Sequence, residues 1–253
     1  MSKPLHSRHE LVTGGGRGIG RAVAAVLSEA GAVVTVLGRN RATLDEAVAS
    51  GVAQFAITAD VADAASVKSA IAEVAARQPI DILIANAGAA ESAPFGRSDA
   101  ALFQRMMDVN FMGVVHATQA ALPGMLERRQ GRVVAIASTA GLKGYAYVSA
   151  YSAAKHAVIG LVRSLALETA KSGVTVNAVC PGFTETDLLE DSIDNIIKKT
   201  GRSREQAVAE LSKHNPQGRL VAPSEVADAV LWLCGEGAGA ITGQAIAVAG
   251  GEV

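Results

Sequence analysis

Three polar side chains in the middle of the chain have the residue types that a proton-transfer site needs. Ser138 precedes Tyr151 by thirteen positions, and Lys155 follows four positions later. A phenol with an ordinary pKa of about 10 is a poor acid or base near neutrality, but a neighbouring cation lowers that pKa. Residues four apart on a helix share a face, so Lys155 is expected beside Tyr151. The Ser138 hydroxyl can hydrogen-bond a carbonyl oxygen that gains charge. The set therefore predicts the proton-handling half of a ketone–alcohol interconversion.

A glycine-rich turn near the start of the chain predicts the other half, a dinucleotide that carries hydride. Residues 13–20 read T-G-G-G-R-G-I-G. Gly14 permits a sharp exit from a strand, Gly18 permits the backbone to approach a pyrophosphate, and Gly20 permits the following helix to lie close to the sheet. An unliganded strand-to-helix turn is the alternative. The residues assigned to this part of the site are Thr13, Gly14, Gly16, Arg17, Gly18, Ile19 and Gly20.

The end of the second predicted strand indicates which dinucleotide is bound. An acidic residue there would hydrogen-bond the adenosine ribose and repel a 2′-phosphate. The chain has Gly38, Arg39 and Asn40 instead, and no carboxylate before Asp45. Arg39, with Arg17 as a second cation, is placed to meet the phosphate of NADP, so we expect NADP(H) rather than NAD(H). Ordinary solvated arginines are the alternative. The adenine edge is assigned to Asp60 and Val61, and a tight turn beside the cofactor to Asn86, Ala87 and Gly88.

Composition restricts the class of protein. The chain has 253 residues, of which 49% are apolar and only 4% aromatic, so we expect one domain, residues 1–253, with an aliphatic core. A net charge of −1 gives no case for nucleic acid or an anionic membrane. No apolar run reaches the roughly 18–20 residues that span a bilayer, and residues 1–10 lack the apolar core of a signal peptide. Cys180 and Cys234 lack metal-ligand spacing. We expect a cytoplasmic protein without a metal.

Short apolar runs alternate with amphipathic stretches, which is the pattern of βα units on a parallel sheet. The predicted strands are 11–12, 33–37, 53–58, 80–85, 132–137, 175–179 and 245–248. The predicted helices are 18–30, 41–49, 64–77, 99–128, 149–171 and 223–235, and Pro123 should kink or end the fourth. We expect an α/β fold in which helices cover both faces of a doubly wound sheet, with ligands beyond the carboxyl ends of the strands.

Two segments depart from this pattern. Residues 8–10 read R-H-E just before the first strand, where a buried central strand should be apolar. Either that strand is short, or Glu10 finds a partner or a protonated state. Residues 183–217 are polar, with helical patterns at 187–199 and 203–214. We expect this long segment at the carboxyl edge to be a substrate lid.

With these residues in place, the chain resembles the short-chain dehydrogenase/reductase family, in its variety of about 250 residues. The resemblance extends over residues 11–251. The motifs that carry it are T-G-x3-G-I-G at 13–20, N-A-G at 86–88, Asn110, Ser138, Y-x3-K at 151–155, Asn177 and P-G at 181–182. It implies a Rossmann-type fold and a homo-oligomer, a dimer of dimers that uses helix 149–171 and the helix before it.

The resemblance also implies roles for single residues. Asn110, Ser138, Tyr151 and Lys155 look like the catalytic set of the family. Asn110, in a helix over 103–115, would hold a water that relays protons from Lys155, and Lys155 would also hydrogen-bond the nicotinamide ribose. The residues expected to contact the nicotinamide are Pro181, Gly182, Thr184 and Thr186. His116 and His156 are interpreted as packing or surface residues.

The substrate is less closely specified. Tyr145 and Tyr147 are rivals of Tyr151 for the acid role, but neither has a lysine four residues later. The substrate pocket is assigned to Ser138, Leu142, Tyr145, Tyr147, Tyr151, Phe183 and Leu188. The lid cations Lys198, Lys199, Arg202 and Arg204 either steer a phosphate-bearing carrier or form a plain solvated face.

Similarity to family members that reduce 3-oxoacyl thioesters favours a CoA or acyl-carrier-protein substrate. The first alternative is a small or cyclic ketone without a carrier. A dinucleotide-binding regulatory protein without turnover would have no need for Tyr151 and Lys155 together. A nucleotide-sugar epimerase would need a longer C-terminal domain.

Overall fold

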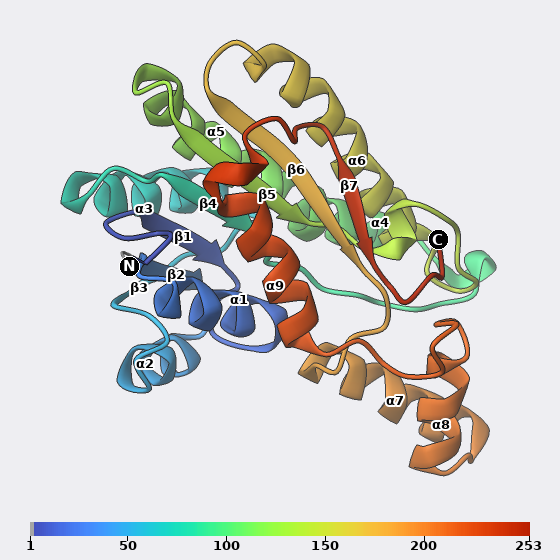
Figure 1. Ribbon diagram of the computed structural model, residues 1–253. Coiled ribbons are helices and arrows are strands. Elements are labelled where there is room, and N and C mark those ends of the chain that lie inside the picture. The colour runs from blue at the N-terminus through green and yellow to red at the C-terminus, as the bar shows by residue number, and fades with distance from the viewer. Residues whose placement is uncertain (1–2) are drawn as a thin grey trace.

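The chain folds around a parallel sheet of seven strands, in the spatial order β3-β2-β1-β4-β5-β6-β7 (Figure 1). The structure, a computed structural model, describes residues 3–253 apart from the side chains at positions 191, 195 and 199. The strand order reverses between β1 and β4, so the loops after these two strands diverge and open a crevice at the carboxyl edge. The strands are β1 (His9–Thr13), β2 (Val33–Gly38), β3 (Phe55–Thr58), β4 (Ile82–Ala85), β5 (Gly131–Ile136), β6 (Val174–Pro181) and β7 (Ala245–Val248).

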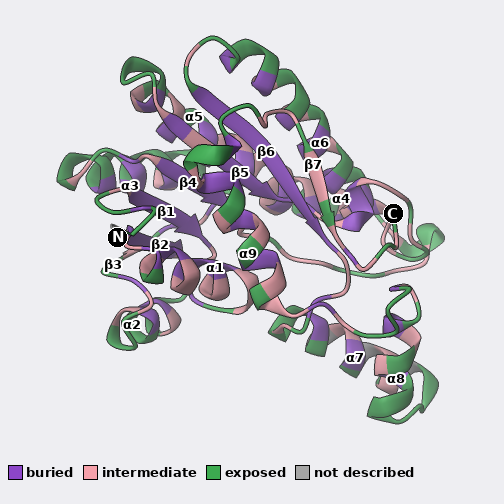
Figure 2. Cartoon of the chain, in the orientation of Figure 1, coloured by how far each residue is buried: buried purple, intermediate pink, exposed green. Residues whose placement is uncertain are grey.

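Helices cover both faces of the sheet, which confirms the doubly wound fold. Side chains of α1, α2 and α9 share one apolar cluster with the sheet, and those of α3, α5 and α6 share the other. Figure 2 shows the central strands buried between these layers, whereas β7 at the edge of the sheet is only partly buried. The helices are α1 (Gly18–Glu29), α2 (Arg41–Ala49), α3 (Ala64–Arg77), α4 (Ala100–Met107), α5 (Gly113–Glu127), α6 (Ser149–Thr169), α7 (Asp187–Thr200), α8 (Arg204–Ser212) and α9 (Pro223–Cys234). None of the helices in the described part is long and apolar enough to cross a membrane.

The helix predicted over 99–128 is divided, and not at the proline. A π-helical turn, Asp108–Met112, separates α4 from α5 and places Asn110 outside regular α-helix. Pro123 does not end α5, which continues to Glu127. A proline removes one helical hydrogen bond, but Ala121 and Met125 on either side of it are buried and hold the helix against the core.

The first strand is longer than predicted, and it carries two buried polar residues. His9 is satisfied, because its ring nitrogens contact the carbonyl oxygen of Gln78 at 2.7 Å and the hydroxyl of Thr35 at 2.9 Å. Glu10 is fully buried, and neither carboxyl oxygen has a hydrogen-bond partner among the described residues. Burial, with a smaller effect of Asp81, raises the pKa of Glu10 well above its ordinary value. Of the two explanations for Glu10, the protonated state fits.

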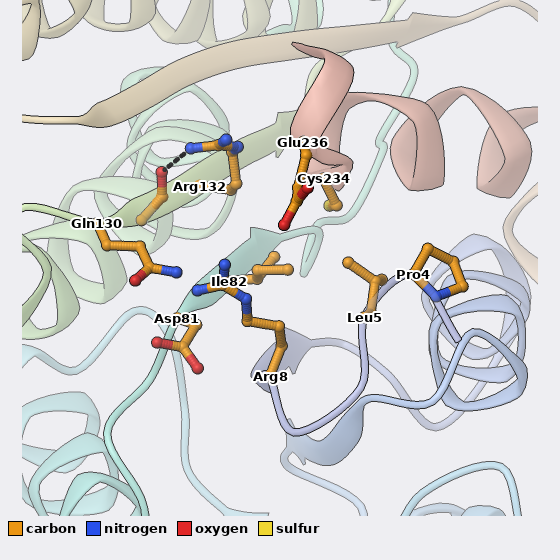
Figure 3. A pocket seen from close by; sticks show the side chains of 10 residues that line it. Pro4, Leu5, Arg8, Asp81, Ile82, Gln130, Arg132, Cys234 and Glu236 are labelled. Carbon is orange, nitrogen blue, oxygen red and sulfur yellow. Dashed lines mark hydrogen bonds between the residues drawn. The ribbon is translucent and has the colours of Figure 1, made fainter. Parts of the chain in front are cut away.

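A small cavity of about 30 Å³ lies at the amino edge of the sheet, on the opposite side from the diverging loops (Figure 3). Charged side chains from the starts of the strands, among them Arg8, Asp81 and Arg132, point toward it, and Cys234 and Glu236 close it from the end of α9. Arg132 donates to the carbonyl oxygen of Gly131. Because the cavity lies at the amino edge, it is separate from the candidate site.

The segment after β6 forms a small unit of its own. The two helical patterns predicted there are confirmed as α7 and α8, which pack on each other through Leu189, Ile193, Ala207 and Leu211. In Figure 1 this orange pair stands away from the sheet at the carboxyl edge. Thr184 and Val221 form a β-bridge that ties the two ends of the segment together.

Candidate active site

The glycine turn between β1 and α1 has the conformation that a phosphate cradle requires. Gly14 and Gly18 have φ of +65° and +52°, in the left-handed region that favours glycine. A Cβ on Gly20 would lie 2.2 Å from the carbonyl oxygen of Gly14, so only glycine lets α1 approach the turn so closely. A Cβ on Gly18 would instead occupy the space in front of Thr186, which lies 3.4 Å away. The Arg17 side chain makes no capping bond to α1, which leaves the N–H groups of the first turn for an anion.

Thr13 and Asn86 hold this turn against β4. The backbone N–H groups of Asn86 and Ala87 donate to the Thr13 hydroxyl at 2.9 and 3.0 Å. The Asn86 side chain donates to the carbonyl oxygens of Thr13 and Gly14 at 2.9 and 3.2 Å. These two side chains therefore act on the cofactor site through the backbone that they position.

The adenosine end of the candidate site carries the arginine that the sequence predicted there. Arg39 is exposed at the end of β2, with a guanidinium nitrogen 3.8 Å from the Asp60 carboxylate. Arg17 likewise lies 3.9 Å from Asp187. Both pairs are long and exposed, so neither holds its arginine tightly. The Asn40 side-chain oxygen is used differently, because it accepts from the N–H groups of Ala42 and Thr43 and caps α2.

The residues therefore fit a dinucleotide. The turn leaves a cradle at Gly18, α1 presents uncapped N–H groups, and Arg39 is exposed at the end of β2. No group of three or more His, Cys, Asp or Glu side chains in the described part of the chain could hold a metal ion.

Tyr151 and Lys155 lie together on the first turns of α6, as the spacing predicts. The Lys155 Nζ atom lies 5.7 Å from the centroid of the Tyr151 ring. It donates to the carbonyl oxygen of Ile136, at the end of β5, at 2.8 Å. The residue is 4% exposed, and burial lowers the pKa of Lys155 to about 8.

Ser138, between β5 and α6, brings the third polar side chain of the set and its second hydroxyl. A hydrogen bond with Ser138 lowers the pKa of Tyr151, but burial has the larger and opposite effect, so the pKa of Tyr151 lies above its ordinary value. This corrects the expectation that a neighbouring cation makes Tyr151 more acidic. The Lys155 ammonium is directed at the Ile136 carbonyl, and loss of water around the buried phenol is the largest influence on the pKa of Tyr151.

Asn110 reaches the same place from the π-helical turn. Its side chain is fully buried, accepts from the N–H of Ala89 at 3.2 Å and donates to the carbonyl oxygens of Ala89 and Met106 at 2.9 and 3.1 Å. Gly88 lies between Asn110 and Lys155, because a Cβ there would be 2.7 Å from Asn110 Oδ1 and 3.7 Å from Lys155 Nζ. Single π-helical turns are frequent at functional sites, and this one directs an amide toward the candidate catalytic lysine.

The loop after β6 begins at a buried Pro181 and then turns toward the glycine turn. The Thr184 hydroxyl donates to the carbonyl oxygen of Gly182 at 2.9 Å, and the Thr186 hydroxyl donates to that of Thr184 at 3.3 Å. The contact between Thr186 and Gly18 brings this loop next to the cradle. Of the predicted nicotinamide residues, Thr186 is therefore placed beside the predicted pyrophosphate turn.

The predicted substrate residues are only partly brought together. Tyr145 packs edge-on against Phe183, with ring centroids 5.9 Å apart. Burial is the largest cause that raises the pKa of Tyr145, the hydrogen bond to Glu252 is the next, and the nearby Tyr151 adds a smaller effect. Leu142 packs against the core beside α6. Tyr147 and Leu188 are 67% and 37% exposed, so they are at the rim at most. Tyr147 has φ of +68°, a strained conformation for a non-glycine residue.

Four residues that were not singled out from the sequence belong to this wall, although one of them, His214, lies within the segment 183–217 that was predicted to be a substrate lid. Tyr145 hydrogen-bonds Thr139 and Glu252, while Lys143 pairs with Glu252 at 3.1 Å and the His214 ring packs on Tyr145. No motif or periodicity indicates them, because Glu252 is 107 positions from Tyr145. Only the adjacency of Thr139 to Ser138 could have suggested one of them.

Two of the four lid cations are paired with carboxylates of the lid. Arg202 pairs with Glu210 at 3.3 Å and Arg204 with Glu190 at 2.5 Å. The side chain of Lys199 lies outside the described part of the chain.

His116 contacts the carbonyl oxygen of Val61 at 2.9 Å, and His156 contacts that of Ser152 at 2.9 Å, which agrees with packing roles. Cys180 and Cys234 are buried and free.

Comparison with known proteins gives consistent matches over the whole fold. A family model described as short chain dehydrogenase matches residues 8–197. A putative ketoacyl reductase of Streptomyces coelicolor is 40% identical over 248 residues, which cover 95% of each chain. A 3-oxoacyl-(acyl-carrier-protein) reductase of Staphylococcus aureus is 36% identical and covers 97% of this chain and 98% of its own. The crystal structure of a single-residue variant of actinorhodin polyketide ketoreductase with NADPH has a TM-score of 0.93 at 36% identity, over 97% of each chain.

Proposed function

The chain belongs to the short-chain dehydrogenase family, and on that premise we propose that this oxidoreductase reduces a 3-oxoacyl thioester to the 3-hydroxyacyl thioester with NADPH. The observation that carries the proposal is the convergence of Ser138, Tyr151 and Lys155 beside Gly88, at the edge where the glycine turn opens. A carbonyl that sits at this point meets two hydroxyls within the reach of a dinucleotide.

The chemistry divides among the side chains. A bound nicotinamide supplies the hydride. Tyr151 donates a proton to the carbonyl oxygen, and its raised pKa suits this role, because the phenol stays protonated at neutral pH. Ser138 hydrogen-bonds the same oxygen as its charge develops. Lys155 holds the nicotinamide ribose, and Asn110 holds a water through which the proton of Tyr151 is replaced.

The relatives of the chain support a thioester as the substrate. Two of them carry the names of a ketoacyl reductase and a 3-oxoacyl-(acyl-carrier-protein) reductase, and they match almost the full chain. The aromatic wall of Tyr145 and Phe183 suits the acyl part of such a substrate. The pairing of Arg202 and Arg204 with lid carboxylates takes support away from a phosphate contact on the lid, and this observation favours a ketone without a carrier as the second candidate.

The preference for NADPH over NADH is proposed from Arg39. This arginine is exposed, and its nearest carboxylate is 3.8 Å away, so it is free to exchange Asp60 for a 2′-phosphate. A phosphate carries more charge than a single carboxylate and accepts a bidentate contact. Asn40 contributes through the N-cap of α2, which fixes the loop that carries Arg39.

The test is a panel of substrates followed by loss of NADPH absorbance. Acetoacetyl-CoA, an acetoacetyl acyl-carrier protein and free cyclic ketones are compared at equal concentrations. We expect the highest kcat/KM with one of the two thioesters. A higher value with the free ketones would replace the thioester proposal by the carrier-free alternative, and no turnover of any of them would contradict a reductase.

We also propose that the enzyme works in the cytoplasm as a dimer of dimers in which α5 and α6 meet their counterparts. Leu167 on α6 is 81% exposed and Leu126 on α5 is 39% exposed, so both helices offer apolar surface for such a contact. Light scattering measures the mass, and a monomeric value would contradict this assembly.

A further inference from the structure

The segment after β7 returns to the substrate wall. The Glu252 side chain is 1% exposed, although only one residue follows it in the sequence. Its Oε1 accepts a hydrogen bond from the Tyr145 hydroxyl at 2.5 Å and lies 3.1 Å from the Lys143 ammonium. Its Oε2 is buried next to Gly182, where a Cβ would lie 3.2 Å away, and has no hydrogen-bond partner among the residues that the structure describes. A segment that buries a carboxylate in this way is fixed to the site.

The direction of the hydrogen bonds at Tyr145 follows from their chemistry. A carboxylate only accepts, so the single Tyr145 proton goes to Glu252. The Thr139 hydroxyl, 2.6 Å away, then donates to the Tyr145 oxygen. Both partners of Tyr145 are therefore assigned, and the ring cannot rotate without breaking two short bonds.

Tyr145 lies between the catalytic loop and the lid. Thr139 follows Ser138 directly, while the Tyr145 ring packs edge-on against Phe183 and His214, with centroids 5.9 and 5.7 Å apart. The turn before Glu252 packs on the lid as well, because a Cβ on Gly250 would fall 1.9 Å from Asn215. Glu252 thus connects the loop that follows Ser138 with the lid through one aromatic ring.

From these contacts we propose that Glu252 is a positioning residue that sets substrate specificity: its carboxylate fixes Tyr145 as a rigid wall and so limits the size of the group beside the reacting carbonyl. This inference rests on the proposed ketone reduction. Without Glu252 the ring loses its acceptor and turns away, which leaves more room. Ketones with a bulky substituent then gain relative to small ones, through KM.

The experiment compares acetoacetyl-CoA with benzoylacetyl-CoA, at saturating NADPH. We expect Glu252→Ala to raise the ratio of kcat/KM for the bulky over the small thioester by about fivefold or more, an effect of the size that one altered pocket contact gives. The kcat for acetoacetyl-CoA should change by less than about twofold, as expected of lost positioning without lost chemistry. Glu252→Gln keeps an acceptor for Tyr145 and should stay close to the original ratio.

Two controls separate this role from a general effect of the tail. A chain that ends at Glu252 lacks only Val253, which is 48% exposed, and should keep the original ratio. In a Tyr145→Phe background, Glu252→Ala should have no further effect on the ratio, because the two changes remove one and the same hydrogen bond. An unchanged ratio in Glu252→Ala, or additive effects in the double variant, would overturn the proposal. If the unaltered enzyme reduces neither thioester, the proposed function fails first, and the ratio is not defined.

Discussion

The Lys155 ammonium lies 5.7 Å from the centroid of the Tyr151 ring and donates to the carbonyl oxygen of Ile136 at 2.8 Å. This bond anchors the lysine to the end of β5, the strand that precedes Ser138. The candidate catalytic residues are therefore held by the sheet and by α6 together. How far activity falls when one of these side chains is changed depends on how firmly that side chain is placed.

Tyr151→Phe should lower kcat for ketone reduction by about 10²–10⁴-fold, the usual contribution of a positioned proton donor. The ring itself is retained, so NADPH affinity and melting temperature should stay near those of the unaltered enzyme. Steady-state rates, cofactor titration by fluorescence and thermal unfolding measure the three quantities. Retention of full activity would assign proton donation to another group.

Lys155→Met should weaken NADPH binding and lower kcat together, because one ammonium serves both. Burial lowers the pKa of Lys155 to about 8 in the free enzyme, so the charge is present below that pH and is lost above it. The Kd for NADPH of the unaltered enzyme should therefore rise as the pH passes through about 8. The variant should lack this step. A pH series of Kd values for both proteins makes the comparison, and a step of the same size in both would remove Lys155 from cofactor binding.

Arg39→Asp should raise the Kd for NADPH by at least about tenfold, since it removes a charged hydrogen bond and adds a repelling carboxylate. NADH lacks the phosphate, so its Kd should change little. Arg41→Gln provides the matched control, because Arg41 is equally exposed but already paired with Asp45 at 2.8 Å. Equal affinity for NADPH before and after the Arg39 change would refute the phosphate contact.

Glu10→Gln should make the protein more stable than the original, and the difference in the free energy of unfolding should grow as pH rises. Burial raises the folded-state pKa of Glu10 well above its ordinary value, so between the two pKa values the unfolded chain has lost the proton that the folded chain keeps. The free energy of unfolding of the original protein therefore falls by about 1.4 kcal/mol for each pH unit between the two pKa values. Below the ordinary pKa of a glutamate the two proteins should differ little. Urea unfolding at a series of pH values measures this, with the exposed Glu127→Gln as a control. Parallel stability curves for the Glu10 variant and the original would contradict a buried neutral acid.

The sequence was sufficient for those parts of the site that lie in short motifs. Gly14, Gly18 and Gly20 are recognisable because a turn onto a helix needs them at fixed spacing, and Tyr151 and Lys155 because one helical turn separates them. The alternation of apolar runs likewise predicts the order of strands and helices. These features are local, and local spacing is what a sequence displays directly.

The remainder depended on distance in space and on burial. The pairing of Tyr145 with Glu252 joins positions 107 apart, and no periodicity reports it. The spacing of Tyr151 and Lys155 predicts that they are neighbours, but it does not show how much water surrounds the phenol. The predicted direction of the shift in the Tyr151 pKa was therefore wrong. The apolar pattern over 99–128 runs through the π-helical turn without a break, because one additional residue hardly changes the pattern.

That turn, Asp108–Met112, also fixes the length of the chain between α4 and α5. Each residue advances a helix by about 100°, so a deletion here would rotate the buried side of α5, with Gly113 and Val114, relative to α4. If α5 kept its packing after such a deletion, the rotation would fall on the π-helical turn and direct the Asn110 amide away from Ala89. We therefore expect insertions and deletions within these five residues to displace the Asn110 amide, whereas a change of length at an exposed position such as Gly144 should leave it in place.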